Sequence, residues 1–230
     1  MWTLALACAF FLCIHLMISG TTLKEQLIGG IGRIAYYALF SLFSVVGVMW
    51  MSVAFVIALG NHDGLNHTFW TAPLFLRILA LVGNFLAFLL VVLGVLSPSP
   101  SNLLALRGLP EKPVYGIIRV SRHPILAGIG LWALIHLICN GNLASWVFFG
   151  SILAVCALGA NNIDRKREAQ FGEVYRLIKK RTSIVPFVAI IEGRTAFVPD
   201  ELGYARMFLA SATFAVFAVL HELLFSVRAL

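Results

Sequence analysis

Charged residues are scarce in this sequence. Asp, Glu, Lys and Arg make up 12% of its 230 residues, whereas hydrophobic residues make up 60%. A water-soluble domain with this composition would be covered by apolar surface, so the soluble classes are excluded. The sequence therefore predicts a protein whose solvent is the lipid bilayer.

The motifs of several enzyme and cofactor classes are also missing. The cysteines form neither a CxxC pair nor the CxxCH motif that attaches c-type haem. The residue four positions after His221 is Phe225, which excludes the HExxH zinc motif of metalloproteases. Gly29, Gly30 and Gly32 lack the spacing of a dinucleotide-binding loop. No internal repeat indicates an inverted-repeat transporter.

Six long apolar segments are present instead. Each approaches or exceeds the roughly 17 to 25 residues that a helix needs to cross a bilayer core of about 30 Å. The segments are residues 2–19, 34–59, 73–96, 124–140, 143–160 and 203–225. Because lipid cannot satisfy backbone polar groups, the spans are expected to be helices. The predicted fold class is an all-α, polytopic membrane helix bundle of about six transmembrane helices, in a single domain over residues 1–230.

The basic residues predict an orientation. Of the 17 Lys and Arg residues, all except Arg77 and Arg228 lie in alternate loops or at their edges, which share one side of the membrane. The positive-inside rule makes that side cytoplasmic and puts both termini outside. The net charge of +7 then suits anionic headgroups, so membrane lipid is the expected partner and no nucleic acid is required.

Two connections between the spans are long. Residues 97–123 are rich in Pro and Ser and end in Arg122-His123, before Pro124 at the first turn of the next span. The apolar residues of the second connection recur at helical spacing, which predicts an amphipathic cytoplasmic helix near residues 164–181. Residues 184–191 are too short to span the membrane and contain a proline, so we expect them to be interfacial or re-entrant.

Histidines in or beside the spans are the main candidates for chemistry, because polar groups in hydrocarbon are costly. By depth, His15 and His123 are expected near the inner surface, and His136 and His221 near the outer surface. Imidazoles at matched depth suit axial ligation of haem iron, with one nitrogen on iron and the other held by an acceptor. A hydrogen-bonded packing role between helices is the alternative for each of them.

Arg122 is a candidate anion contact at the mouth of the fourth span. Its guanidinium offers two-pronged donor geometry to a phosphate, a carboxylate or a haem propionate. The alternative is a positive-inside anchor with no ligand.

Four blocks of the sequence together resemble the NnrU family of membrane proteins. The blocks are residues 15–20, 119–124, 131–142 and 181–187, and the likeness extends over nearly the whole chain. The resemblance implies an inner-membrane protein of bacteria, associated with denitrification and nitric oxide metabolism. Nitric oxide reductase or another respiratory component is then an expected partner.

The family includes the plant 15-cis-zeta-carotene isomerases, which hold haem b. The resemblance therefore implies haem b as a cofactor, with His15 matching an isomerase histidine implicated in that site. His123 and His136 are further candidate iron ligands, and Arg122 and His221 further cofactor contacts. Isomerase-like catalysis, electron transfer, nitric oxide sensing and assembly of a nitric oxide reductase all stay open.

A second resemblance is to membrane methyltransferases that use S-adenosylmethionine at the cytoplasmic face. It is carried by Arg122-His123-Pro124, Glu168, Phe171-Gly172, Tyr175 and Val185-Pro186. The adjacent pair of glutamates in those enzymes is replaced here by Arg167-Glu168. A methyltransferase-like enzyme is thus the alternative function.

Overall fold

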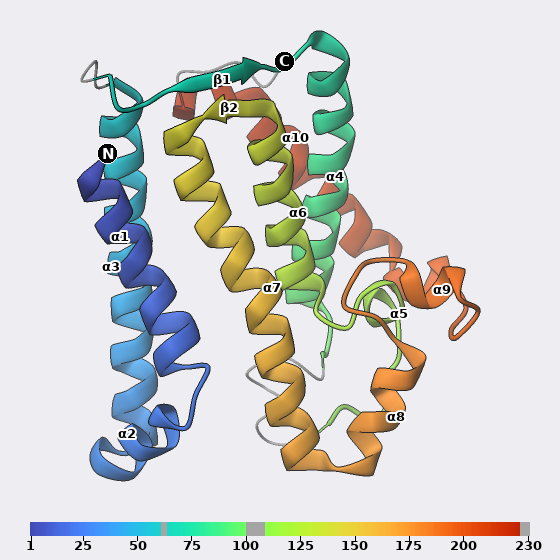
Figure 1. Cartoon of the computed structure of the whole chain (residues 1–230). Coiled ribbons are helices and arrows are strands. Elements are labelled where there is room, and N and C mark those ends of the chain that lie inside the picture. Colours follow the sequence, from blue (N-terminus) through green and yellow to red (C-terminus); the bar gives the residue numbers. More distant parts are fainter. Residues whose placement is uncertain (61–63, 100–108, 226–230) are drawn as a thin grey trace. The chain divides into compact units, whose positions relative to one another are not determined.

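The computed structural model describes residues 1–60, 64–99 and 109–225 (Figure 1). The structure is about 77% helical with almost no strand, which confirms the predicted all-α class. The described residues group into two compact units. One comprises Met1–Pro73 and Ala133–Gly159, and the other comprises Leu74–Trp132 and Ala160–Leu230.

The first unit begins with a broken helix. Helix α1 (Trp2–Leu12) passes into a π-helical segment, η1 (Cys13–Ile18), and is followed after a bend of 84° by α2 (Leu23–Ile31). Helix α1 packs against α3 (Arg33–Gly60), the long helix beside it in Figure 1. The close approach depends on Gly47, because a Cβ there would lie 3.3 Å from the Phe10 ring.

A small two-stranded sheet completes this unit. Strand β1 (Thr68–Thr71) pairs antiparallel with β2 (Asn140–Asn142), which joins α6 (Pro124–Cys139) to α7 (Leu143–Phe171). A side chain at Gly141 would collide with the Trp70 carbonyl oxygen, so this pairing requires glycine.

The second unit is built around α4 (Leu74–Leu96), α10 (Tyr204–Phe225) and the beginning of α6. Its buried core joins α4 to the short helices α5 (Ile117–Val120) and η3 (Pro199–Leu202). Gly128 of α6 lies against α4, where a Cβ would be 2.6 Å from the Ala87 carbonyl oxygen. The structure thus supports the expectation that this glycine permits close helix approach.

Among the described residues, four helices are individually long and apolar enough to cross a membrane, and the bent α1–α2 pair makes a fifth candidate span. The four are Arg33–Gly60, Leu74–Leu96, Leu143–Phe171 and Tyr204–Leu223. The remaining expected span coincides with α6, an apolar helix of 16 residues or about 24 Å, which is shorter than these candidate spans. The polytopic helical class is confirmed, while the orientation of the termini stays a prediction.

The amphipathic helix expected near residues 164–181 is divided in the structure. Helix α7 continues through Phe171, and a new helix, α8 (Glu173–Arg181), starts after Gly172. Gly172 has φ of +55°, a left-handed conformation that favours glycine and reverses the chain. The short α9 (Val188–Ile191) follows α8.

Candidate functional site

Residues 121–123 link α5 to α6 and are tied to a distant segment by backbone hydrogen bonds. Arg122 N donates to Ser183 O (2.8 Å), and Phe187 N donates to Val120 O (2.9 Å). The Ser121 hydroxyl also donates to Ile184 O (2.7 Å). The strand-like conformation of Ser121, with φ −148° and ψ 138°, makes this side-by-side pairing possible.

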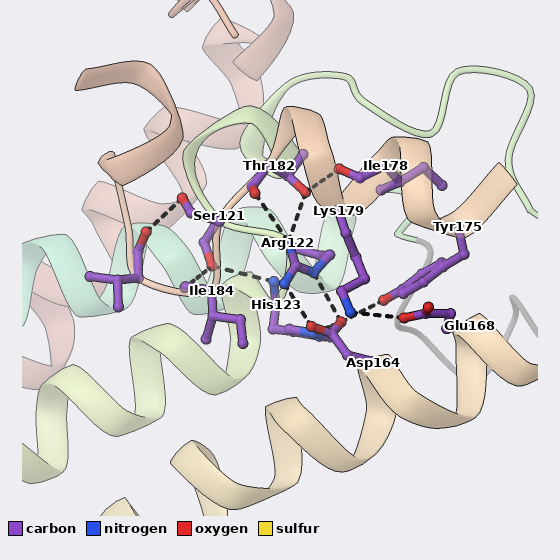
Figure 2. A network of polar contacts seen from close by, with 12 residues as sticks. Ser121, Arg122, His123, Asp164, Glu168, Tyr175, Ile178, Lys179, Thr182 and Ile184 are labelled. Atoms are coloured by element: carbon purple, nitrogen blue, oxygen red, sulfur yellow. Dashed lines mark hydrogen bonds and ion pairs between the residues drawn. The ribbon is translucent and has the colours of Figure 1, made fainter. Parts of the chain in front are cut away.

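Arg122 and Asp164 form a buried ion pair at this crossing (Figure 2). Arg122 Nε and Nη2 donate to the two oxygens of Asp164 at 2.9 and 2.6 Å. Arg122 Nη1 donates to the Thr182 carbonyl and hydroxyl oxygens at 3.1 and 3.0 Å. Because Arg122 is only 5% exposed, this two-pronged geometry compensates a charge that would otherwise be costly to bury.

Asp164 also accepts hydrogen bonds from His123 and Tyr175. Its Oδ1 atom lies 2.8 Å from His123 Nε2 and 2.8 Å from the Tyr175 hydroxyl (Figure 2). Since the carboxylate paired with Arg122 only accepts, both partners donate to it. Burial raises the pKa of the Tyr175 hydroxyl well above its usual range, and the negative charge of Asp164 adds to the rise. Tyr175 therefore stays protonated as a donor.

We refer to Arg122, His123, Asp164, Tyr175 and Thr182 as the Asp164 cluster. His123 is 2% exposed, and its Nδ1 atom is buried without a hydrogen-bond partner in the part of the chain that the structure describes. The hydrogen bond from Nε2 to Asp164 fixes the orientation of the ring and leaves Nδ1 as its ring nitrogen without a partner among the described residues.

A polar hollow of about 500 Å³ lies beside Asp164, between the end of α7 and α8. Two of its cations are paired with Glu168, which accepts from Lys179 Nζ at 2.8 Å and from Arg176 Nε at 3.0 Å. Glu168 and Lys179 adjoin Asp164 in Figure 2. The hollow is lined by Asn161, Asp164, Arg165, Glu168, Ala169, Arg176 and Lys179.

A second ion pair supports the same unit. Arg119 of α5 donates from Nε and Nη2 to the carboxylate of Glu201, at 2.7 and 2.8 Å. Glu201 also accepts from Gly116 N at 2.7 Å. The Arg119 guanidinium holds the pKa of the Glu201 carboxyl below its usual range. This ion pair connects η3 to α5, the helix directly before residues 121–123 of the chain.

His15 has a different environment, in the π-helical segment of the first unit. Its Nδ1 atom donates to the Phe11 carbonyl oxygen at 2.9 Å, which leaves Nε2 as the nitrogen with a lone pair. The ring lies 4.1 Å from the Phe11 ring and 5.3 Å from the Phe40 ring, centre to centre. We refer to His15, Phe11 and Phe40 as the His15 site.

The other two candidate histidines lie apart in the chain. His136 is half-buried on α6, with its ring 4.8 Å from that of Phe149 in the first unit. His221 is half-buried on α10 in the second unit. Among the five candidate residues, the structure brings Arg122 and His123 together. Each histidine pair expected from depth has one member in each unit.

The sequence interpretation missed the residue at the centre of the cluster. Asp164 lies 41 residues from His123 in the chain, and Tyr175 follows it by 11. The available signal was a carboxylate at the end of an apolar run, directly before Arg165-Lys166-Arg167. Such a residue needs a cationic partner when it is buried.

A haem would need fewer protein ligands than a bare metal ion. Over the described residues, no group of three or more His, Cys, Asp or Glu side chains is placed to hold a bare metal ion. Haem iron needs only one or two axial histidines, because the porphyrin supplies the other four nitrogens. His15 meets that requirement, since its second nitrogen is held by a carbonyl acceptor.

Comparisons with known proteins agree on one family. The model of the family described as NnrU protein matches residues 3–229. Two curated relatives are the chloroplastic 15-cis-zeta-carotene isomerases of Arabidopsis thaliana, 36% identical over 123 residues, and of Zea mays, 35% identical over 109 residues. These matches cover 52% and 46% of this chain, but only 32% and 30% of the relatives. No solved structure matches the chain.

Proposed function

This chain belongs to the NnrU family, and from that premise we propose that it is a membrane protein that binds haem b through His15. The observation that carries the proposal is the hydrogen bond from His15 Nδ1 to the Phe11 carbonyl. Metal-ligating histidines generally donate their other ring N–H to such an acceptor, which fixes the tautomer and the ring orientation. The lone pair of His15 Nε2 is then available to ligate iron.

The surroundings of His15 support the same proposal. Phe11 and Phe40 lie against its ring, and aromatic side chains of this kind suit the apolar faces of a porphyrin. The π-helical turn at Cys13–Ile18 adds a second indication, because such turns occur frequently at functional sites. The residues that would hold the cofactor are thus His15 on iron and the two rings beside it.

His136 is the second candidate ligand that belongs to the same compact unit. Arg122 is better explained by the Asp164 cluster, because its guanidinium already donates to the protein's own carboxylate. His123 also donates from one ring nitrogen to an acceptor, but its ring is only 2% exposed and lies inside that ionic cluster, whereas His15 lies among aromatic rings. A bound haem b supplies a redox-active iron that takes small diatomic ligands. The protein contributes the ligand, its orientation and an apolar environment.

The biological role that we propose is in denitrification and nitric oxide metabolism at a bacterial inner membrane. Family membership and the proposed haem support this role, since nitric oxide is a ligand of haem iron. Nitric oxide added to the reduced, purified protein should shift the Soret band at one equivalent per haem. A reduced spectrum unchanged by nitric oxide would contradict a direct role and favour an assembly factor for a nitric oxide reductase.

Isomerase-like catalysis is the second candidate, and the 36% identity to a 15-cis-zeta-carotene isomerase favours it. The shared segment covers about half of this chain. Incubation of the haem-loaded protein with 15-cis-zeta-carotene, followed by chromatography of the products, tests it. Turnover that disappears in His15→Ala supports this activity, whereas unchanged substrate rejects it.

The methyltransferase alternative is tested by ligand binding. It requires saturable binding of S-adenosylmethionine that weakens when Arg122 is substituted. In the structure, the donors of that guanidinium are directed to Asp164 and Thr182. We therefore expect no saturable binding in a calorimetric titration, and saturable binding would revive this alternative.

The test of haem binding itself is spectroscopic. The protein is purified in detergent from cells supplied with haem precursor, and oxidised and dithionite-reduced spectra are recorded. We expect a Soret band and the reduced α and β bands of haem b, with at least one haem per chain. A protein that is folded by circular dichroism but has no Soret band would contradict the proposal.

A further inference from the structure

The segment after α8 exposes apolar side chains together, outside the candidate spans. Val185 is 62% exposed, Phe187 40%, Ile191 81% and Phe197 46%. The rings of Phe187 and Phe197 lie 6.2 Å apart, centre to centre. We call these four residues the α9 surface. Contiguous exposed apolar side chains of this kind commonly mark a site of protein or membrane contact.

The backbone of this segment is held in a costly conformation. Phe187 has φ of +67°, and it is the non-glycine residue with positive φ in the described chain. For a bulky residue this left-handed region is unfavourable, because Cβ approaches the following carbonyl oxygen. Its conformation is enforced by the hydrogen bond to Val120 O and by the α9 amides of Ile190 and Ile191, which donate to Phe187 O. These hydrogen bonds compensate the strain and maintain the chain reversal at which Phe187 is exposed.

Hydrogen bonds locate the α9 surface beside the start of α6 and near the end of the candidate span α7. Ser183 and Phe187 bond to the backbone of residues 120–122, and α6 begins two residues later at Pro124. Asp164, near the end of the α7 span, is joined to the same crossing through Arg122. Helix α7 has 29 residues, or about 43 Å, so its end extends beyond a hydrocarbon core of about 30 Å. The α9 surface therefore adjoins the boundary between hydrocarbon and headgroups.

The charges beside this surface are predominantly positive. Helix α8 ends in Lys179, Lys180 and Arg181, and Arg194 donates to the carbonyl oxygens of Lys180 and Thr182. Glu192 pairs with Arg194 at 2.6 Å and Glu168 pairs with Lys179 at 2.8 Å, so among the described residues Lys180 and Arg181 carry the uncompensated positive charge of this end. Apolar side chains flanked by Lys and Arg are the pattern of segments that lie in the interface of an anionic membrane.

We propose that the α9 surface inserts into the headgroup and acyl boundary of an anionic leaflet, with the basic end of α8 at the phosphates. The insertion is independent of haem. The insertion anchors the segment with Thr182 and Ser183 to the bilayer. Both residues accept hydrogen bonds from Arg122. The occupant is lipid, because the surface adjoins a membrane helix and its flanking charge is complementary to anionic headgroups.

The test is photo-crosslinking of the full-length protein in its own membranes. A photoreactive p-benzoylphenylalanine replaces Ile191, whose exposure makes the change compatible with folding. The matched control carries the same group in place of Glu173, exposed at the opposite end of α8. We expect lipid adducts, seen by mass spectrometry, at position 191 at least fivefold above position 173. A protein adduct at 191, or equal lipid adducts at both positions, would overturn the proposal.

Lipid composition tests the charge preference. In nanodiscs of equal phosphatidylglycerol and phosphatidylcholine, adducts at position 191 should contain the anionic lipid about fivefold more often, the ratio that corresponds to one cation near an anionic surface. Adducts that mirror the bulk composition would contradict an anionic leaflet as the occupant. Unchanged haem content in the same samples separates this result from the haem proposal.

Discussion

The Asp164 cluster and the His15 site each contain a histidine, but the two imidazoles are held in opposite ways. His123 donates from Nε2 to a carboxylate that also binds Arg122 and Tyr175, inside a buried ionic cluster. His15 makes one hydrogen bond to a carbonyl and otherwise contacts aromatic rings. Both imidazoles donate one nitrogen to an acceptor, so the surroundings of the remaining nitrogen, ionic and buried for His123 but aromatic for His15, are what make His15 the proposed ligand.

Removing the carboxylate should have the largest effect. In Asp164→Asn the buried Arg122 loses its counter-charge, so the free energy of unfolding should fall by about 3–5 kcal/mol. Denaturant titration in mixed micelles measures this loss in the free energy of unfolding. Haem content per folded chain should not change. A variant of normal stability that lacked haem would reverse the roles assigned to the two regions.

The control for that variant is Glu168→Gln on the same helix. Glu168 pairs with Lys179 and Arg176 near the surface, where such pairs contribute about 0–1 kcal/mol. A loss as large as that of Asp164→Asn would show that burial is not the cause.

The Arg119–Glu201 pair should have a smaller, pH-dependent effect. Because Arg119 lowers the pKa of Glu201 in the folded state, the pair stabilises the fold above the carboxyl's unfolded pKa and loses this effect as the pH falls through the folded pKa. At pH 7, Glu201→Gln should cost about 1.5–3 kcal/mol. Unfolding titrations of both proteins should converge at acid pH. A difference independent of pH would exclude this ion pair as the source.

Tyr175→Phe isolates one hydrogen bond of the cluster. The ring is fully buried, and its hydroxyl donates to Asp164, so the expected loss is about 1 kcal/mol. Stability measured by the same titration should lie between wild type and Asp164→Asn. A loss equal to that of Asp164→Asn would show that the ion pair depends on the hydroxyl.

The smallest effect is expected at the aromatic wall of the His15 site. Phe40→Leu removes the ring that lies edge-on to His15 and should lower haem affinity about threefold without a loss of the cofactor. Competition for haem with apomyoglobin measures the ratio. An unchanged affinity would remove Phe40 from the proposed site.

The sequence supported the helical membrane class because long apolar runs and backbone hydrogen bonding leave few other solutions. The sequence did not reveal that Arg122 pairs with Asp164, because no local pattern indicates a contact between residues that are 42 positions apart in the chain. Within the amphipathic stretch, Tyr175 and Ile178 are buried as the apolar spacing indicated, but Val174 is exposed. Gly172 divides that stretch, and its positive φ depends on the tertiary reversal of the chain.

Ligation of haem b by His15 is tested by the haem content of His15→Ala. Haem per chain is measured as the pyridine haemochrome in His15→Ala, His123→Ala and wild type, purified in parallel and checked for folding. We expect at least a tenfold loss in His15→Ala and a near-normal content in folded His123→Ala. Normal haem in His15→Ala, or loss confined to His123→Ala, would contradict it.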